Sequence, residues 1–268
     1  MGTAVQAQYE SSRASSDLAS MDAAAEYVRK NLSTILPMYV VAMLPFSAAI
    51  MLTIDIVTSQ YRAMTLLTSW CLVAATLWRW AWLAALQRRV QAVIRGGEPH
   101  KIRGRLLSIL FLRLVASACM TWGSLVIAPG IYGFLIGGMA TPLHLEPSDR
   151  PKDQIKTVIS WITSSQKRLL KILTSLSFLY VLGLICFYAL IRIVLGTLLP
   201  TFLGIDPSDM GFTLESWTGI LVVSYLVGLV FDLYWAVLSV MIFYDLQSRR
   251  LAPDLRVRIR NLRNSTST

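Results

Sequence analysis

Five ionisable side chains lie inside long apolar stretches of this 268-residue sequence. They are Asp55, Arg79, Arg113, Arg192 and Asp232. A charge at membrane depth needs an opposite charge, a water-filled cavity or a route to the interface, and such residues often mark ion or substrate pathways. If these stretches cross a membrane, the five residues are the first candidates for transport or catalysis.

The positions of these residues along the expected helices predict two groups. Arg79, Arg113 and Asp232 fall at one depth, with Arg113 ~10 Å from the cytoplasmic face at the helical rise per residue. We expect an intramembrane polar cluster in which Asp232 contacts Arg79 or Arg113. Asp55 and Arg192 share a depth near the outer interface, and we expect them to form an outer-interface pair.

A purely structural role explains the same residues. Arg79 lies between Trp78 and Trp80, close enough to the cytoplasmic face for its guanidinium to reach headgroups while the rings occupy the interfacial belt. Arg113 can extend in the same way. Asp232 has no second carboxylate at its depth, which makes it a poor centre for acid–base catalysis. Replacing Asp232 with Asn separates the two interpretations, since lost transport with an intact fold would favour function.

The composition requires apolar side chains to face lipid. Hydrophobic residues make up 55% of the chain and charged residues 15%, which is more apolar material than one soluble core of this length needs. Several apolar runs reach the ~20 residues that cross a hydrocarbon core as a helix. We therefore expect an all-α fold, a polytopic transmembrane helix bundle.

The apolar runs predict about six spans. They are 33–57, 64–86, two helices within 106–145, 172–199 and 217–243. Pro129-Gly130 interrupts the stretch at 106–145 and predicts a tight hairpin between spans three and four, while Pro142 and Pro147 are expected to end span four. The expected organisation is a disordered tail at 1–20, a membrane domain at 21–250 that starts with an interfacial helix at 21–32, and a basic cytoplasmic tail at 251–268.

The basic residues predict the orientation of these spans. Of the 25 Lys and Arg residues, 21 fall in the segments 1–32, 87–105, 146–171 and 245–268. Cytoplasmic flanks carry such an excess, so we expect both termini in the cytoplasm of a cytoplasmic-membrane protein. A five-span alternative would expose one strongly basic loop outside. The same charge attracts membrane lipids, and its division among four segments argues against nucleic-acid binding.

The fourth span carries small residues on one face. Gly130, Gly133, Gly137 and Ala140 are three or four residues apart, which places them on one side of a helix. We interpret this helix-packing face as internal packing within the chain. A dimer interface and a substrate path are the less favoured alternatives. The following segment, 149–173, has apolar residues at helical spacing and predicts an amphipathic cytoplasmic helix that runs into the fifth span.

Motifs of common chemistries are missing from the sequence. It contains no phosphate-binding glycine loop, no HExxH and no GxSxG. The three cysteines lie inside predicted spans, and His100 and His144 stand apart from other ligand types. We therefore expect no metal, no cofactor and no catalytic residues.

The second half of the chain resembles bacterial membrane proteins of the glycerophosphodiester phosphodiesterase membrane-domain type. The resemblance rests on PGIYGFLIGGMATPLHLE, the amphipathic helix, a span, and FYDLQSRRLAPDL. The family-like C-terminal motif matches at Tyr244, Asp245, Leu246, Arg249, Asp254 and Leu255, with Gln247 where Arg is usual. The resemblance implies a membrane module whose own activity is not established, because catalysis in phosphodiesterase members belongs to a separate soluble barrel.

Two functions remain as hypotheses. In the first, the chain is a non-catalytic integral membrane scaffold or accessory subunit of a bacterial membrane complex, with lipids and other membrane proteins as partners. In the second, it is a small permease or lipid-handling protein in which Asp232 and the arginines line a cavity. Dry packing around Asp232 would favour the first, and a cavity that reaches it would favour the second.

Overall fold

The structure, a computed structural model, is all-helical in the part of the chain that it describes. It describes residues 19–58, 64–95, 105–123, 127–145, 151–203 and 217–265. No strand occurs in these ranges, which confirms the all-α class. The expected tail at 1–20 lies outside them except for its last two residues, which open the first helix.

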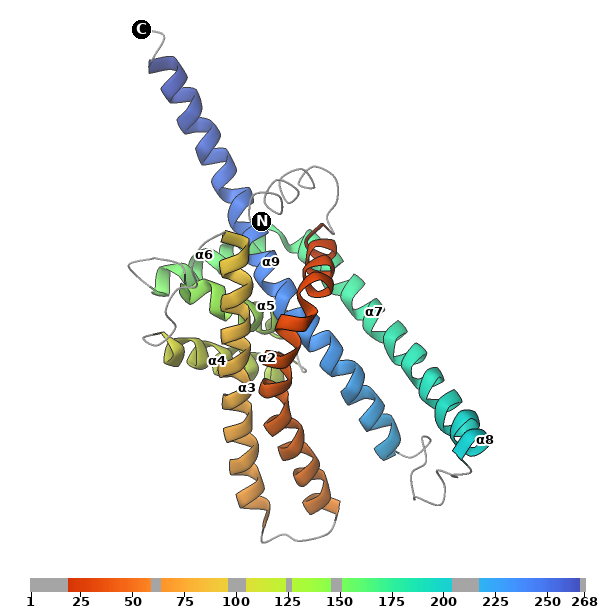
Figure 1. The fold of residues 1–268 in the computed structure, drawn as a ribbon. Helices are drawn as coiled ribbons and strands as arrows, with labels where there is room; N and C mark the ends of the chain where they lie inside the picture. Colours follow the sequence, from red (N-terminus) through yellow and green to blue (C-terminus); the bar gives the residue numbers. More distant parts are fainter. Residues whose placement is uncertain are drawn as a thin grey trace. The chain divides into compact units, whose positions relative to one another are not determined.

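The helices follow one another in the order drawn in Figure 1. They are α2 (Ala19–Thr58), α3 (Thr65–Arg95), α4 (Leu106–Gly123), α5 (Ile127–Leu145), α6 (Pro151–Ser164), α7 (Gln166–Ile193), the π-helical turn η3 (Val194–Leu198), α8 (Leu199–Leu203) and α9 (Trp217–Ser265). The expected C-terminal tail at 251–268 is thus largely a continuation of the last helix.

Among the described helices, three contain segments long and apolar enough to cross a membrane. These segments are Ser20–Thr53, Gln166–Phe202 and Val222–Ser248. Leu106–Met120 and Ile131–Leu143 are apolar but shorter. The predicted second span lies on α3, where Thr, Ser, Trp and Arg79 dilute the apolar residues. A membrane protein built from helices fits these segments.

The chain divides into two compact units. The first consists of Met1–Gln166 with Ala236–Thr268, and the second is Lys167–Trp235. Within the first unit, α2 packs along α3 as an antiparallel pair, and α4 packs against α5 (Figure 1). The core of this unit includes fully enclosed Leu86 of α3, Ile109 of α4 and Leu238 of α9.

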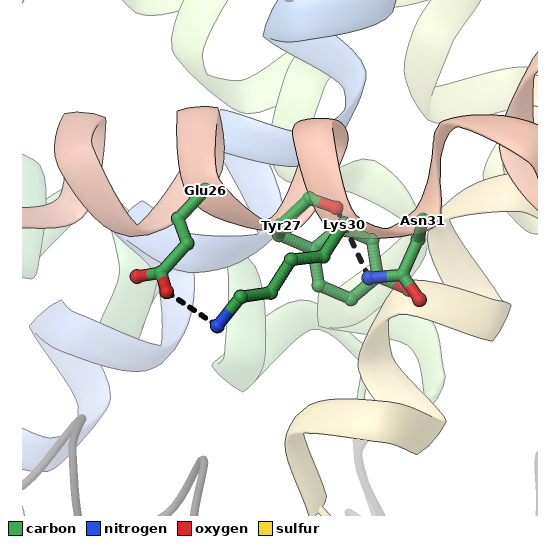
Figure 2. A network of polar contacts seen from close by, with 4 residues as sticks. All are labelled: Glu26, Tyr27, Lys30 and Asn31. Atoms are coloured by element: carbon green, nitrogen blue, oxygen red, sulfur yellow. Dashed lines mark hydrogen bonds and ion pairs between the residues drawn. The ribbon is translucent and has the colours of Figure 1, made fainter.

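Helix α2 is kinked where the sequence predicts an interfacial helix to meet a span. Asn31 leaves helical geometry, with φ −114° and ψ 15°, and its Nδ2 donates to the carbonyl of Tyr27 at 3.0 Å (Figure 2). Glu26 and Lys30, in the turn directly before Asn31, form an exposed ion pair. An Asn side chain that bonds to a nearby backbone carbonyl competes with the hydrogen bonds of the helix, which explains the kink. The kink lies within two residues of the predicted boundary.

The two prolines of the stretch 106–145, Pro129 and Pro142, both fall inside helix α5. Helix α4 ends at Gly123 and α5 begins at Ile127, so Pro129 and Gly130 belong to the first turn of α5. Proline is tolerated there because first-turn N–H groups have no helical acceptor. The sequence predicts that Pro142 and Pro147 end span four, and α5 ends between them at Leu145, so that Pro142 lies inside the helix. The hairpin itself involves residues 124–126, outside the described ranges, and stays a prediction.

The predicted amphipathic helix is present as α6. Val158 and Ile162 are each 2% exposed, whereas Lys156 faces outward. Ser165 separates α6 from α7, although its N–H still donates to the carbonyl of Trp161 at 3.1 Å. Tyr132 of α5 holds this end of α6, because its hydroxyl lies 3.2 Å from Thr163 Oγ1.

The second unit contains α7 and the first part of α9 in contact. The ring of Tyr180 meets that of Phe231 edge-on at 5.2 Å. A Cβ at Gly183 would lie 3.3 Å from Phe231, so the glycine lets this ring approach the backbone of α7. The outer side of α7 exposes large apolar residues, as a lipid-facing helix does. They include Phe178, Ile185, Leu190 and Ile193.

Candidate functional site

Gln87 of α3 stands at the centre of a buried polar cluster in the first unit. Its side chain is 2% exposed. Its Nε2 donates to the carbonyl of Gly138 on α5 at 2.9 Å, and to Ser239 Oγ and the carbonyl of Ala236 on α9 at 3.0 and 3.2 Å. An amide nitrogen has two hydrogens, so one of them is shared between acceptors. A single side chain thus connects three helices.

Arg113 of α4 adds a fourth helix to this cluster. The residue is 6% exposed, and its Nη2 donates to Gln87 Oε1 at 2.7 Å and to Thr141 Oγ1 at 3.2 Å. Its Nη1 donates to the carbonyl of Trp80 at 2.9 Å. Hydrogen bonds from a charged donor are stronger than those between neutral groups. We refer to Gln87, Arg113, Thr141 and Ser239 as the Gln87 cluster.

A proline explains why Gln87 finds an acceptor on α5. In a helix, the carbonyl of Gly138 would accept from the residue four positions later, which is Pro142. Proline has no N–H, so that carbonyl lacks its usual donor. Gln87 supplies the missing hydrogen from the neighbouring helix. This compensation lets α5 continue through Pro142.

Gln91 lies one helical turn after Gln87 and differs from it in one respect. It is 3% exposed, and neither its Nε2 nor its Oε1 has a hydrogen-bond partner among the described residues. Residues four apart on a helix share a face. The Gln87 cluster therefore adjoins an amide whose hydrogen-bonding capacity is unused.

The arginines of the predicted intramembrane cluster occupy different surroundings. Arg79 is half-buried, and its guanidinium carbon lies 4.7 Å from the centre of the Phe46 ring on α2, a cation–π distance. Arg113 bonds within the Gln87 cluster instead. Asp232 is half-buried on α9 in the second unit. Contact between Asp232 and either arginine would join the two units and stays a prediction.

The predicted outer-interface pair is not tested by the structure. Asp55 belongs to the last turn of α2, and its side chain lies outside the described ones. Arg192 is exposed in the last turn of α7, in the second unit. Their pairing therefore stays a prediction.

The small-residue face of α5 lies against α4. A Cβ at Gly133 would stand 2.7 Å from the carbonyl oxygen of Ala116, and one at Gly137 would stand 3.1 Å from the Ala116 Cβ. Ala140 is completely buried. The missing side chains thus allow the backbones of α4 and α5 to approach closely. Gly130 lies outside the residues whose side-chain surroundings are described.

The family-like C-terminal motif is partly described. Tyr244 is 9% exposed, and its ring meets that of Phe243 edge-on at 5.4 Å. Asp245 is half-buried, and its carbonyl accepts from Ser248 Oγ at 2.9 Å. Arg249 and Asp254 are on α9, with side chains outside the described ones. The motif therefore begins near the C-terminal end of the buried part of α9, which runs from Ala236 to Leu246.

Sequence reasoning missed Gln87, Thr141 and Ser239 because it searched the spans for charges. All three are neutral, and Thr and Ser side chains in helices often bond only to their own backbone. One signal was available: Pro142 removes the donor for a carbonyl inside an apolar helix, so another donor is expected, from a neighbouring helix, a nearby hydroxyl or water. The sequence does not say which helix provides it.

The chemistry of the Gln87 cluster is hydrogen bonding rather than proton transfer. General acid–base catalysis requires a group that gains and loses a proton readily near neutral pH. Amide, hydroxyl and guanidinium groups do not do so. Among the described residues, no three His, Cys, Asp or Glu side chains are grouped to hold a metal ion. Comparisons with family models, curated proteins and solved structures find no match for this chain.

Proposed function

We propose that this chain is a non-catalytic integral membrane scaffold or accessory subunit of a bacterial membrane complex. The Gln87 cluster carries the proposal, because Gln87 and Arg113 direct their hydrogen bonds to α3, α4, α5 and α9 of the same chain. Such cross-links hold helices in one arrangement, as a scaffold requires. The resemblance to a membrane module without an established activity of its own agrees with an accessory role.

The proposed topology has six spans and two cytoplasmic termini. Its support is the placement of 21 of the 25 basic residues in four segments that would face the cytoplasm. The paired helices α4 and α5 would form spans three and four, joined by the hairpin. In this arrangement the Gln87 cluster lies towards the cytoplasmic side of the membrane.

Affinity purification from a mild detergent tests the scaffold proposal. We expect stoichiometric co-purifying membrane proteins, identified by mass spectrometry. The Gln87→Leu variant should lose them at equal amounts of folded protein, while Thr76→Val should keep them because the Thr76 hydroxyl bonds only within its own helix in the contacts described. A purified chain that carries a stoichiometric lipid or solute and no protein would contradict the proposal.

A small permease or lipid-handling protein is the second candidate. Asp232 favours it, because a carboxylate within a membrane-spanning helix often marks an ion or substrate pathway. Asp232→Asn removes the charge with little change of shape. If the variant folds as the wild type does but no longer takes up or binds the co-purified solute, the permease is favoured.

A further inference from the structure

The amide of Gln91 is enclosed but has no hydrogen-bond partner in the part of the chain that the structure describes. The residue is 3% exposed, and neither Nε2 nor Oε1 has a partner in the structure. One turn earlier, Gln87 uses both ends of its amide in four hydrogen bonds. The two glutamines on this face of α3 thus differ in their hydrogen bonding, since the amide of Gln87 is fully bonded and that of Gln91 is not.

An unpaired buried amide is unfavourable for a physical reason. In water, its N–H and carbonyl groups are hydrogen-bonded, and burial without replacement loses those bonds. For that reason, buried polar side-chain atoms in proteins nearly always have a protein or ordered-water partner. Gln91 presents two such atoms at one place, and no described residue partners either of them, so a further partner is expected there.

The enclosure of Gln91 restricts what that partner is. A lipid acyl chain offers no hydrogen bond, and another protein does not reach a side chain that its own chain covers almost completely. The partner must accept from Nε2 and donate to Oε1. A small neutral molecule that carries both a donor and an acceptor meets these requirements, and water is the smallest.

We infer that Gln91 and the adjoining Gln87 cluster form a binding site for such a molecule, occupied by an ordered water in the resting protein. The water accepts a hydrogen bond from Gln91 Nε2 and donates one to Gln91 Oε1. Buried waters typically make about three hydrogen bonds, so a further bond to a neighbouring polar group is expected. This inference does not rest on the scaffold function and holds equally for a permease.

An experimental density map of the full chain in lipid nanodiscs, at a resolution that shows ordered water, tests the site directly. We expect a peak within hydrogen-bond distance of Nε2 and Oε1 of Gln91. A peak of single-atom size identifies water, and an elongated peak identifies a small polar solute retained through purification. Absence of a peak, with the amide unpaired or turned onto a protein group, would overturn the inference.

Thermal unfolding of Gln91→Met provides a second test. Met has a similar shape, but it has no donor and its sulfur is only a weak acceptor. We expect the midpoint in nanodiscs to fall by roughly 2–4 °C, because the water loses partners. If the amide is truly unpaired, an apolar replacement relieves its burial, and the midpoint stays or rises. Gln87→Met is the control, since it must lower the midpoint in either case.

Discussion

Trp78 donates from its indole Nε1 to the carbonyl oxygen of Val41 at 3.0 Å, from α3 to α2. Val41 precedes Pro45 by four residues, so its carbonyl is the one that Pro45 deprives of a helical donor. The bond from Gln87 to the carbonyl of Gly138 stands in the same relation to Pro142. Helix α3 thus supplies side-chain donors to two neighbouring helices, at the carbonyls that Pro45 and Pro142 leave open.

The hydrogen bond from Trp78 should contribute more to the free energy of unfolding when Pro45 is present. Trp78→Phe removes the indole donor, and we expect a loss of about 1 kcal/mol in the free energy of unfolding. In a Pro45→Ala background the new backbone N–H occupies the Val41 carbonyl, so the same replacement should cost less. A double-mutant cycle measured by reversible unfolding in mixed micelles gives the coupling. Equal costs in the two backgrounds would contradict this explanation.

Removal of Gln87 should destabilise the first unit more than removal of a hydroxyl that bonds within its own helix. Gln87→Leu deprives Gly138, Ser239 and Arg113 of a partner, and we expect a loss of at least ~2 kcal/mol because a buried charged group is among them. Thr76→Val is the matched control on α3, with an expected change within ~0.5 kcal/mol. Unfolding free energies in mixed micelles compare the two, and similar values would argue against a central role for Gln87.

The helix pattern was predictable where local chemistry decides it. The predicted boundary between 21–32 and 33–57 falls within two residues of the kink at Asn31. The kink has a local cause, because the Asn side chain bonds to a backbone carbonyl nearby in the sequence. The amphipathic segment after residue 149 forms α6, which its apolar residues at helical spacing predict from local sequence alone. That Pro142 lies inside α5 was not predictable, because the donor that replaces its missing N–H comes from Gln87 on another helix.

The buried polar cluster was not predictable from local patterns. Gln87 is 51 residues from Gly138 and 152 from Ser239 in the sequence, and hydropathy shows which residues enter a bundle but not which helices meet. The small-residue face was easier to find, because Gly133 and Gly137 repeat at helical spacing. The helix that covers this face, α4, is its immediate neighbour along the chain.

Gly133 should tolerate no side chain. In Gly133→Ala, the Cβ would lie 2.7 Å from the Ala116 carbonyl oxygen and 3.1 Å from the Met120 nitrogen, and backbone atoms cannot turn aside as a flexible side chain can. We expect a loss of about 1–3 kcal/mol through overpacking. Gly228→Ala in α9 is the control, since nothing lies within 4 Å of the added Cβ. That variant should be neutral or gain up to ~1 kcal/mol from helix propensity.

These two variants separate crowding from backbone effects, because each places Ala inside a helix. The measurement is the unfolding free energy in mixed micelles, with helicity checked by circular dichroism. A Gly133→Ala protein as stable as the Gly228→Ala protein would mean that α4 and α5 do not approach closely at this point.

The proposed topology predicts which positions are reached from outside the cell. In a variant that lacks Cys71, Cys119 and Cys186, Ser208→Cys introduces a thiol into the segment 200–216, which has no Lys or Arg. Because basic residues are retained in the cytoplasm, we expect a membrane-impermeant thiol reagent to label this cysteine in intact cells. Ser267→Cys, near the C-terminus, should be labelled only after the membrane is opened.

A cysteine in the N-terminal segment completes the topology test, and Ser12→Cys provides it. It should behave as Ser267→Cys does if the number of spans is even. Labelling of only one of these two termini in intact cells would show an odd number, and the charge asymmetry would then place a strongly basic loop outside. Labelling of both termini in intact cells, with Ser208→Cys protected, would preserve the even count and reverse the orientation.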